Sequence, residues 1–302
     1  GAIEVYKRKS KDLLLSKPVI WAGGYSSITQ NLGELSNSGF EFEINARIVD
    51  REDFEWHSSF NITLQKNEVT KLYDGHTVLP GDESIRVGYS LQTHVYTQYA
   101  GVNPATGKAF WYDASGNPTY TPSAMKGEDY APYGLPNGMP KCFGGFNNKF
   151  SYKGLTLDIF FQYDYGRVLY DNMTRNLSRK GDGNFNTLQW FYDNRWTEVG
   201  QITSVPRSFD GAAEVGSSRG DINSSRYLQD ASYIRLKNIS LSYDIPKRYL
   251  KGLNISYATL KFQASNIFTI TKFTGHDPEY NSANTGIIPL MKSVNMGISI
   301  GF

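Results

Sequence analysis

Hydrophobic and polar residues alternate one by one along several segments of this chain. The clearest case is the last nine residues. One side of the pattern holds Val294, Met296, Ile298, Ile300 and Phe302, and the other holds Asn295, Gly297, Ser299 and Gly301. Successive side chains of a strand point to opposite faces of its sheet. The pattern therefore predicts a final strand with one apolar face and one small, polar face.

Seven further segments carry a strand signal. They are Ala2–Leu14, Gly39–Val49, Phe54–Gln65, Cys142–Tyr152, Leu155–Tyr165, Ser232–Ile245 and Asn254–Thr269. The alternation in Leu155–Tyr165 is clean, and its length matches the roughly 9–11 residues that a tilted strand needs to cross a bilayer. In Ser232–Ile245 the apolar phase slips at Lys237-Asn238, which predicts a β-bulge there. The fold class expected is all-β, an antiparallel transmembrane β-barrel segment of about eight strands.

The connections between these segments alternate in length. The short ones are 50–53, 153–154 and 246–252, and the long ones lie near 15–38, 66–141, 166–231 and 270–292. Bacterial barrels have short periplasmic turns and long extracellular loops. If Phe302 lies on the periplasmic side, every short turn falls there as well. The alternation therefore favours a multi-pass barrel in the outer membrane, in contact with its lipid.

Composition agrees with a strand-rich chain and excludes two other classes. Aromatic residues make up 14% of the 302 residues and there are 29 glycines, a mixture that favours strands and turns. No apolar run reaches the roughly 18 residues of a membrane helix. The formal net charge of +2 comes from scattered residues and gives no argument for a nucleic-acid partner. The chain opens at Gly1 directly on strand-like sequence, so we expect it to be a piece of a longer protein.

Three stretches resemble the C-terminal third of SusC-like TonB-dependent transporters: NLGELSNSGFEFEI (Asn31–Ile44), YIRLKNISLSYDIP (Tyr233–Pro246) and SNIFTITKFTGHDPE (Ser265–Glu279). The similarity runs through residues 1–302 and includes Ala100–Tyr120 and the final Gly301-Phe302. It implies a plugged outer-membrane barrel of about 22 strands from a Bacteroidetes-type bacterium. It also implies a SusD-like surface lipoprotein as partner, and import of oligosaccharides or peptides energised by TonB–ExbB–ExbD. The plug and the segment that contacts TonB would lie in an N-terminal region missing from this chain.

The residues themselves offer few candidates for chemistry. His57, His76, His94 and His276 are far apart in sequence and have no metal-ligand spacing, so we expect neither a catalytic site, nor a metal, nor a cofactor. The Gly275–Glu279 stretch, GHDPE, combines a base with two carboxylates but reads as an ordinary loop with Asp-Pro turn chemistry. Gly144-Gly145 is expected to permit a bend or close packing in the barrel wall.

Aromatic side chains in the long loops are the only candidate ligand surface, because Trp and Tyr rings stack on the apolar faces of sugars. These candidates are Trp111, Tyr112, Trp190, Tyr192 and Trp196. The competing and favoured interpretation is that they pack the long loops against each other or against the lipoprotein.

Two other functions remain open from the sequence. One is a self-contained eight-strand outer-membrane barrel that acts as an adhesin or a lipid-modifying enzyme, against which the start at Gly1 without a leader argues. The other is a soluble all-β glycan-binding module built on the loop aromatics. The first requires the first and last strands to pair, and the second requires the apolar face to be buried against another layer.

Overall fold

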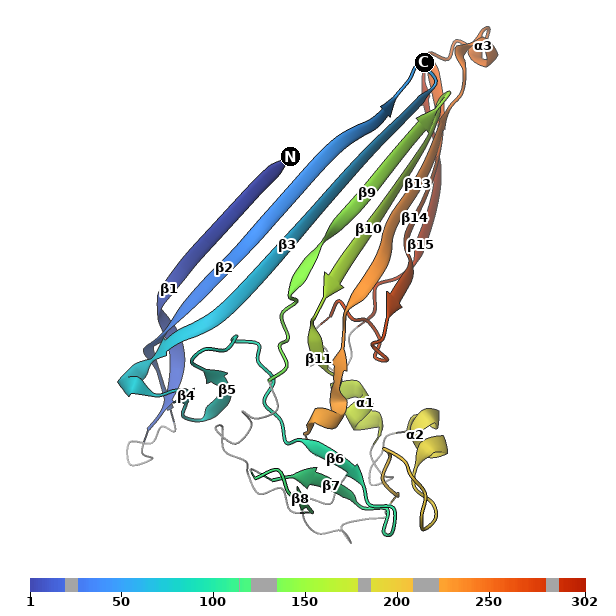
Figure 1. The fold of residues 1–302 in the computed structure, drawn as a ribbon. Coiled ribbons are helices and arrows are strands. Elements are labelled where there is room, and N and C mark those ends of the chain that lie inside the picture. The colour runs from blue at the N-terminus through green and yellow to red at the C-terminus, as the bar shows by residue number, and fades with distance from the viewer. Residues whose placement is uncertain (20–26, 114, 121–134, 179–185, 209–222, 281–287) are drawn as a thin grey trace.

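One antiparallel sheet of eight strands dominates the computed structural model, which describes residues 1–302 except 20–26, 114, 121–134, 179–185, 209–222 and 281–287 (Figure 1). The strands are β1 (Ala2–Pro18), β2 (Ser27–Asp50), β3 (Phe54–Leu72), β9 (Cys142–Tyr152), β10 (Leu155–Tyr165), β13 (Tyr233–Asp244), β14 (Tyr257–Thr271) and β15 (Ser293–Gly301). They follow one another in chain order across the sheet, so each pairs with its sequence neighbours. The predicted eight strands are therefore confirmed.

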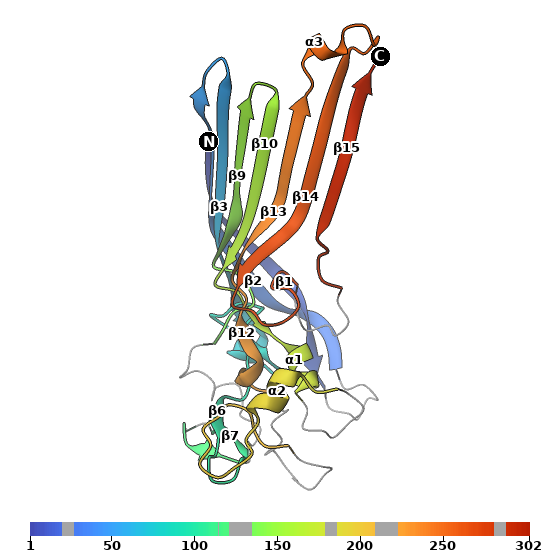
Figure 2. The same ribbon diagram turned by 90° about the vertical axis from the view of Figure 1, so that its right-hand side faces the viewer.

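The remaining elements form small structures on the long connections. These are η2 (Tyr73–Gly75), β4 (Val78–Leu79), β5 (Asp82–Arg86), β6 (Tyr99–Val102), β7 (Ala109–Tyr112), β8 (Pro118–Thr119), β11 (Val168–Tyr170), α1 (Asn172–Leu177), α2 (Gln189–Asn194), η5 (Ser225–Tyr227), β12 (Leu228–Asp230) and α3 (Lys247–Leu250). Figures 1 and 2 show that all of these except α3 gather at one end of the sheet. The opposite end holds the short turns, α3 and the C-terminus. No helix in the described part of the chain is long and apolar enough to cross a membrane.

The register aligns the apolar positions of neighbouring strands on one face. Leu157 lies opposite Phe150 of β9 and Leu241 of β13, and that row continues through Phe262 to Met296. Side chains of this face lie open to the surroundings: Ile298 is 57% exposed and Met296 79%. Among the described residues, neither a second sheet nor a helix layer covers it. We call this the apolar face, and the opposite one the polar face.

The two edges of the sheet are β1 and β15, which do not pair with each other in the described structure. A self-contained eight-strand barrel requires that pairing to close. The uncovered apolar face likewise disagrees with a soluble module, whose apolar strand positions would be buried in a core. The described structure therefore lacks the feature that each alternative requires: paired edge strands for a self-contained barrel, and a buried apolar face for a soluble module.

Three strands extend beyond the predicted bounds. The sequence predicts a long loop at 15–38, but β1 continues to Pro18 and β2 begins at Ser27. It also predicts a loop from residue 66, but β3 continues to Leu72. The backbone ladder needs no apolar side chains to persist, so alternation stops earlier than pairing does. The turn predicted at 246–252 contains the short helix α3, and β14 begins at Tyr257, three residues later than predicted; Asn254, before it, has a positive φ of 52°.

The predicted irregularities of the wall are confirmed. The pairing of β13 with β10 and with β14 shifts register around Lys237, between Leu236 and Asn238. At Gly144 and Gly145, rings from β10 replace the missing side chains. A Cβ at Gly144 would lie 2.6 Å from the Tyr163 hydroxyl, and one at Gly145 would lie 2.7 Å from the Phe160 ring. The two glycines therefore let an aromatic ring lie across each face of β9.

Candidate functional site

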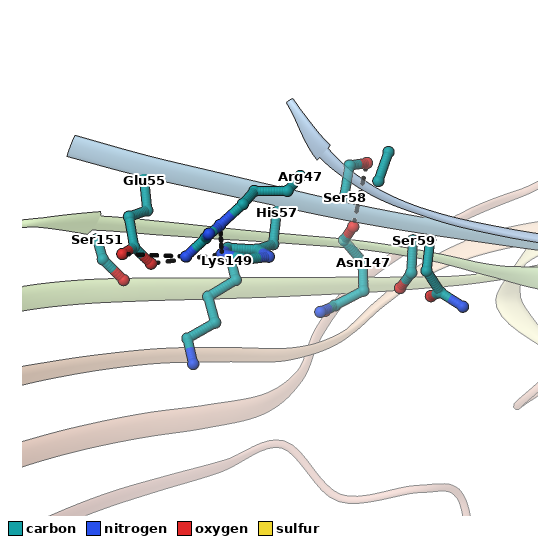
Figure 3. Close-up of a pocket in the computed structure, with 10 residues that line it drawn as sticks. Arg47, Glu55, His57, Ser58, Ser59, Asn147, Lys149 and Ser151 are labelled. Carbon is teal, nitrogen blue, oxygen red and sulfur yellow. Dashed lines mark hydrogen bonds and ion pairs between the residues drawn. The ribbon is translucent and has the colours of Figure 1, made fainter. Parts of the chain in front are cut away.

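On the polar face, near the short turns, charged side chains form an ion network (Figure 3). Arg47 pairs with Asp50 at 2.6 Å and with Glu55 at 3.4 Å, and Glu55 also lies 3.4 Å from the His57 ring nitrogen. The network borders a cavity of about 470 Å³ that Lys149 and Ser151 of β9 also line. His57 is therefore part of a wall network on the polar face, as the strand pattern predicted.

A second ion cluster lies at the loop end of the polar face and is buried. Arg235 of β13 is only 3% exposed, and its guanidinium contacts Asp277 at 2.6 Å and Glu279 at 2.5 Å. Its Nε donates to the Thr269 hydroxyl at 2.8 Å, and Lys237 contacts Glu279 at 2.9 Å. A buried cation of this kind is tolerated only when carboxylates pair with it. The segment after β14 is thereby held against the wall.

This cluster gives the GHDPE loop, whose predicted turn chemistry is confirmed, an additional long-range ionic role. The turn chemistry is present, since the Asp277 carboxylate accepts the backbone N–H of Glu279 at 2.9 Å. The same carboxylate, together with that of Glu279, also neutralises a buried arginine 42 and 44 residues earlier in the chain. Arg235 occupies a polar-face position of a predicted strand, but its partners lie in a distant loop that no local pattern indicates.

Two cavities open beside the buried cluster, and both are lined by Arg167 and Glu279. One, of about 370 Å³, includes Gln162 and Asp164 of β10; the other, of about 540 Å³, includes His94. Arg167 joins the two by contacting Asp164 at 3.0 Å and donating to the Glu279 carbonyl at 3.3 Å. The clefts offer charged groups of both signs and amide side chains, which can form hydrogen bonds with a polar solute.

Burial favours the neutral form of His94. Its Nε2 donates to the carbonyl of Val168 at 2.8 Å, and its ring stacks near Tyr96 at a centroid distance of 6.0 Å. Burial lowers the pKa of His94 because the charged imidazolium loses its hydration, and the bond to the carbonyl only partly opposes that shift. The imidazole therefore serves as a hydrogen-bond donor that links the 91–96 segment to β11.

The five predicted ligand aromatics do not form a single surface. Trp111 of β7 is fully buried and lies edge-on to Tyr99 at 6.2 Å. Trp196 donates its ring N–H to the Pro104 carbonyl at 3.0 Å and covers Gly107, where a Cβ would come within 2.4 Å of the ring. Tyr112, beside Trp111 in the sequence, is half-buried on β7. Trp196 therefore packs one long loop against another, and Trp111 is enclosed within the loop structures.

Trp190 and Tyr192 are different, because the short helix α2 presents both to the outside. They are 53% and 56% exposed, whereas Phe191 between them is buried and fastens the helix to the loop structure. The Arg195 guanidinium lies 3.7 Å from the centre of the Tyr192 ring. Of the predicted candidates, only these two rings are both large and openly accessible.

Comparison with known proteins gives a consistent family. TonB-dependent receptor P3 of Formosa agariphila is 29% identical over all of this chain, and the receptor SusC of Bacteroides thetaiotaomicron is also 29% identical over all of it. The solved structures described as the RagAB peptide transporter and as the RagAB peptide importer in the open-open state cover 99% of the chain, with TM-scores of 0.81 and 0.82 and identities of 29% and 30%. The chain is similar to SusC-like TonB-dependent receptors throughout its length.

This chain matches only part of each relative. It spans 32% of receptor P3, 30% of SusC and 33% of the first RagAB chain. No protein-family model matches it. The resemblance expected from YIRLKNISLSYDIP and GHDPE is confirmed.

Proposed function

We propose that this chain, residues 1–302, is the C-terminal part of an outer-membrane importer barrel. Its apolar face would meet lipid, its polar face would line the transport path, and the structures around 66–141, 166–231 and 270–292 would lie outside the cell. Import of oligosaccharides or peptides would be energised through TonB–ExbB–ExbD, which the N-terminal region of the complete protein would contact.

The height of the apolar face is the observation that supports a membrane wall most directly. On β10 it runs from Leu155 to Tyr165, ten residue steps. At about 3.3 Å per step this is roughly 33 Å along the strand. With the tilt of about 40° found in such barrels, it is about 25 Å along the membrane normal, the height of their usual apolar band. Longer strands such as β3 leave this band only at the loop end.

The partner at the loop end would be a SusD-like lipoprotein. Support comes from SusC among the relatives and from RagAB, whose solved structures are described as a peptide transporter and importer. The RagAB structures support peptides as a substrate class, and oligosaccharides stay in the proposal because the sequence resemblance implies them. The exposed rings of Trp190 and Tyr192 would contact either the substrate or the lipoprotein, whereas Trp111, Tyr112 and Trp196 would support the loops.

Deletion of the gene for the complete protein tests the proposal. The strain is supplied with a panel of fluorescent oligosaccharides and oligopeptides, and accumulation is measured with and without the protein. The proposal predicts that accumulation of one substrate class is lost, and that the same loss follows when the proton gradient that drives TonB is collapsed. Complementation with the intact gene is the control.

Membrane fractionation separates the location of the protein from its transport activity. The protein should enter the outer-membrane fraction, and its gel migration should change on boiling, as that of a folded barrel does. Recovery of folded protein from the soluble fraction without detergent contradicts the proposed location. Unchanged uptake of every solute in the deletion strain contradicts the proposed activity.

A further inference from the structure

The apolar face ends abruptly on strands β1, β2 and β3, and a basic row replaces it. The last apolar row consists of Val5, Phe40 and Leu64, which the register places side by side. Two residues further toward the loop end, the corresponding row consists of Lys7, Ser38 and Lys66. Because side chains repeat every second residue, the lysines point to the same side as the apolar residues below them.

The next row on the same face consists of Lys9, Ser36 and Glu68. Lys7 and Lys9 are exposed, and the Lys66 side chain is 66% exposed while it pairs with Glu68. Three cations therefore face one carboxylate. We call Lys7, Lys9 and Lys66 the basic patch.

The other charges nearby do not cancel the basic patch. Glu4 and Arg8 occupy the opposite parity of β1 and therefore lie on the polar face, where the Arg8 guanidinium stacks 5.1 Å from the centre of the Tyr6 ring. Lys11 and Asp12 follow in the irregular stretch where the pairing of β1 shifts register. Their opposite charges add nothing net.

The position of the basic patch relative to the apolar face determines what it can meet. Two residues of a strand cover about 6.6 Å, and less along the membrane normal when the strand is tilted. If the apolar face is bathed in hydrocarbon, the lysine stems leave it just where lipid headgroups begin. Lysine ammonium groups are compact charges that bind phosphate well, and cations beside an anionic surface are attracted over a Debye length.

We propose that Lys7, Lys9 and Lys66 bind the phosphate groups of anionic lipids in the leaflet on the loop side of the barrel. The inference rests on the proposed membrane location and adds a specific lipid contact to it. The boundary also explains the unexpected length of β2 and β3: the strands continue above the bilayer, where their outward side chains no longer need to be apolar.

The test measures lipid preference locally, with the complete protein reconstituted in vesicles. A bimane fluorophore is attached at position 40 after Phe40→Cys, in a Cys142→Ser background, so that it lies one row below the lysines. Its quenching is compared in vesicles containing 5-doxyl phosphatidylglycerol and in vesicles containing 5-doxyl phosphatidylcholine. We expect the anionic lipid to associate about threefold more strongly, and 0.5 M NaCl to reduce the preference toward about 1.

The matched variants locate the cause. The triple variant Lys7→Gln, Lys9→Gln, Lys66→Gln should lose the preference. Lys261→Gln removes an exposed lysine from the polar face of β14 and should leave it unchanged. Equal quenching by both lipids in the unmodified patch, or an equal effect of Lys261→Gln, overturns the lipid contact while leaving the membrane location intact. Competition by 10 mM inorganic phosphate would assign the patch to free anions and also overturn it. Quenching by neither lipid would instead contradict the proposed membrane wall.

Discussion

An arginine placed on either side of one strand gives a sharp test of the two faces. Ile239 and Ser240 are adjacent on β13, near mid-height of the apolar band, and their side chains have opposite parity. Ile239 lies in a row with Ile159 and Ala264 on the apolar face, and Ser240 lies opposite Asp158 on the polar face. The two positions share depth and strand and differ only in the medium that they meet.

The expected cost follows from that medium. Arginine facing lipid at the midplane of a barrel costs about 2–4 kcal/mol, whereas lumenal positions tolerate charge. Ile239→Arg should therefore lower the free energy of unfolding by about that amount. Ser240→Arg, beside the Asp158 carboxylate, should change it by less than about 1 kcal/mol.

The assay is urea unfolding of the complete protein in phosphatidylcholine vesicles, with the folded fraction followed by the gel-migration change on boiling. A cost for Ser240→Arg equal to or larger than that for Ile239→Arg would refute the assignment of faces. Complete failure of Ile239→Arg to fold, with detergent-independent folding of the unmodified chain, would point to a dry protein core in place of lipid.

Three further outcomes follow from the loop end. Arg235→Met should release the segment after β14 at a cost of about 3–5 kcal/mol. Adding Asp277→Leu should recover part of that loss, because an unpaired buried carboxylate is removed. Amide hydrogen exchange of residues 273–280 measures both effects, and additive effects of the two substitutions would contradict the pairing. Trp111→Ala should destabilise the loop structures by about 3–5 kcal/mol. Trp190→Ala should leave stability within about 0.5 kcal/mol and weaken uptake or lipoprotein binding. The reverse pattern in thermal unfolding and uptake assays would contradict the assignment of Trp111 to packing and of Trp190 to binding. The pKa of His94 lies below its ordinary value of about 6.5, so the contribution of this residue to loop stability is present above that pH and is lost as the pH falls. Proteolysis of residues 91–96 should therefore accelerate between pH 7.5 and 5.5. The same acceleration in His94→Gln would show that another group is responsible.

Alternation alone is sufficient to predict the strands of the apolar face. The segments Cys142–Tyr152 and Leu155–Tyr165 have the bounds that the sequence predicted, because alternate residues along them share one largely apolar face. The bulge at Lys237 was equally visible, since it shifts the phase of the apolar residues. Strand bounds and the bulge are therefore predictable where apolar and polar residues alternate.

Beyond the apolar face the sequence pattern predicts much less of the structure. Residues Ser27–Ser38 of β2 pair through backbone groups and carry no continuous apolar alternation, so they read as loop. The contact of Arg235 with Asp277 depends on a loop folding back across the sheet, which no local pattern encodes. The same holds for Trp190 and Trp111: both lie in long loops, and only the packing of those loops makes one exposed and the other buried.

The central claim is that one face of the sheet contacts hydrocarbon and the other contacts water. Nitroxide labels placed singly at positions 156–162 of β10, after Cys142→Ser, measure this directly in vesicles through collisions with oxygen and with a water-soluble nickel complex. The account predicts oxygen maxima at 157, 159 and 161 and nickel maxima at 156, 158, 160 and 162. Accessibility without this two-residue period, or low accessibility to both reagents at Leu157 and Ile159, would contradict it.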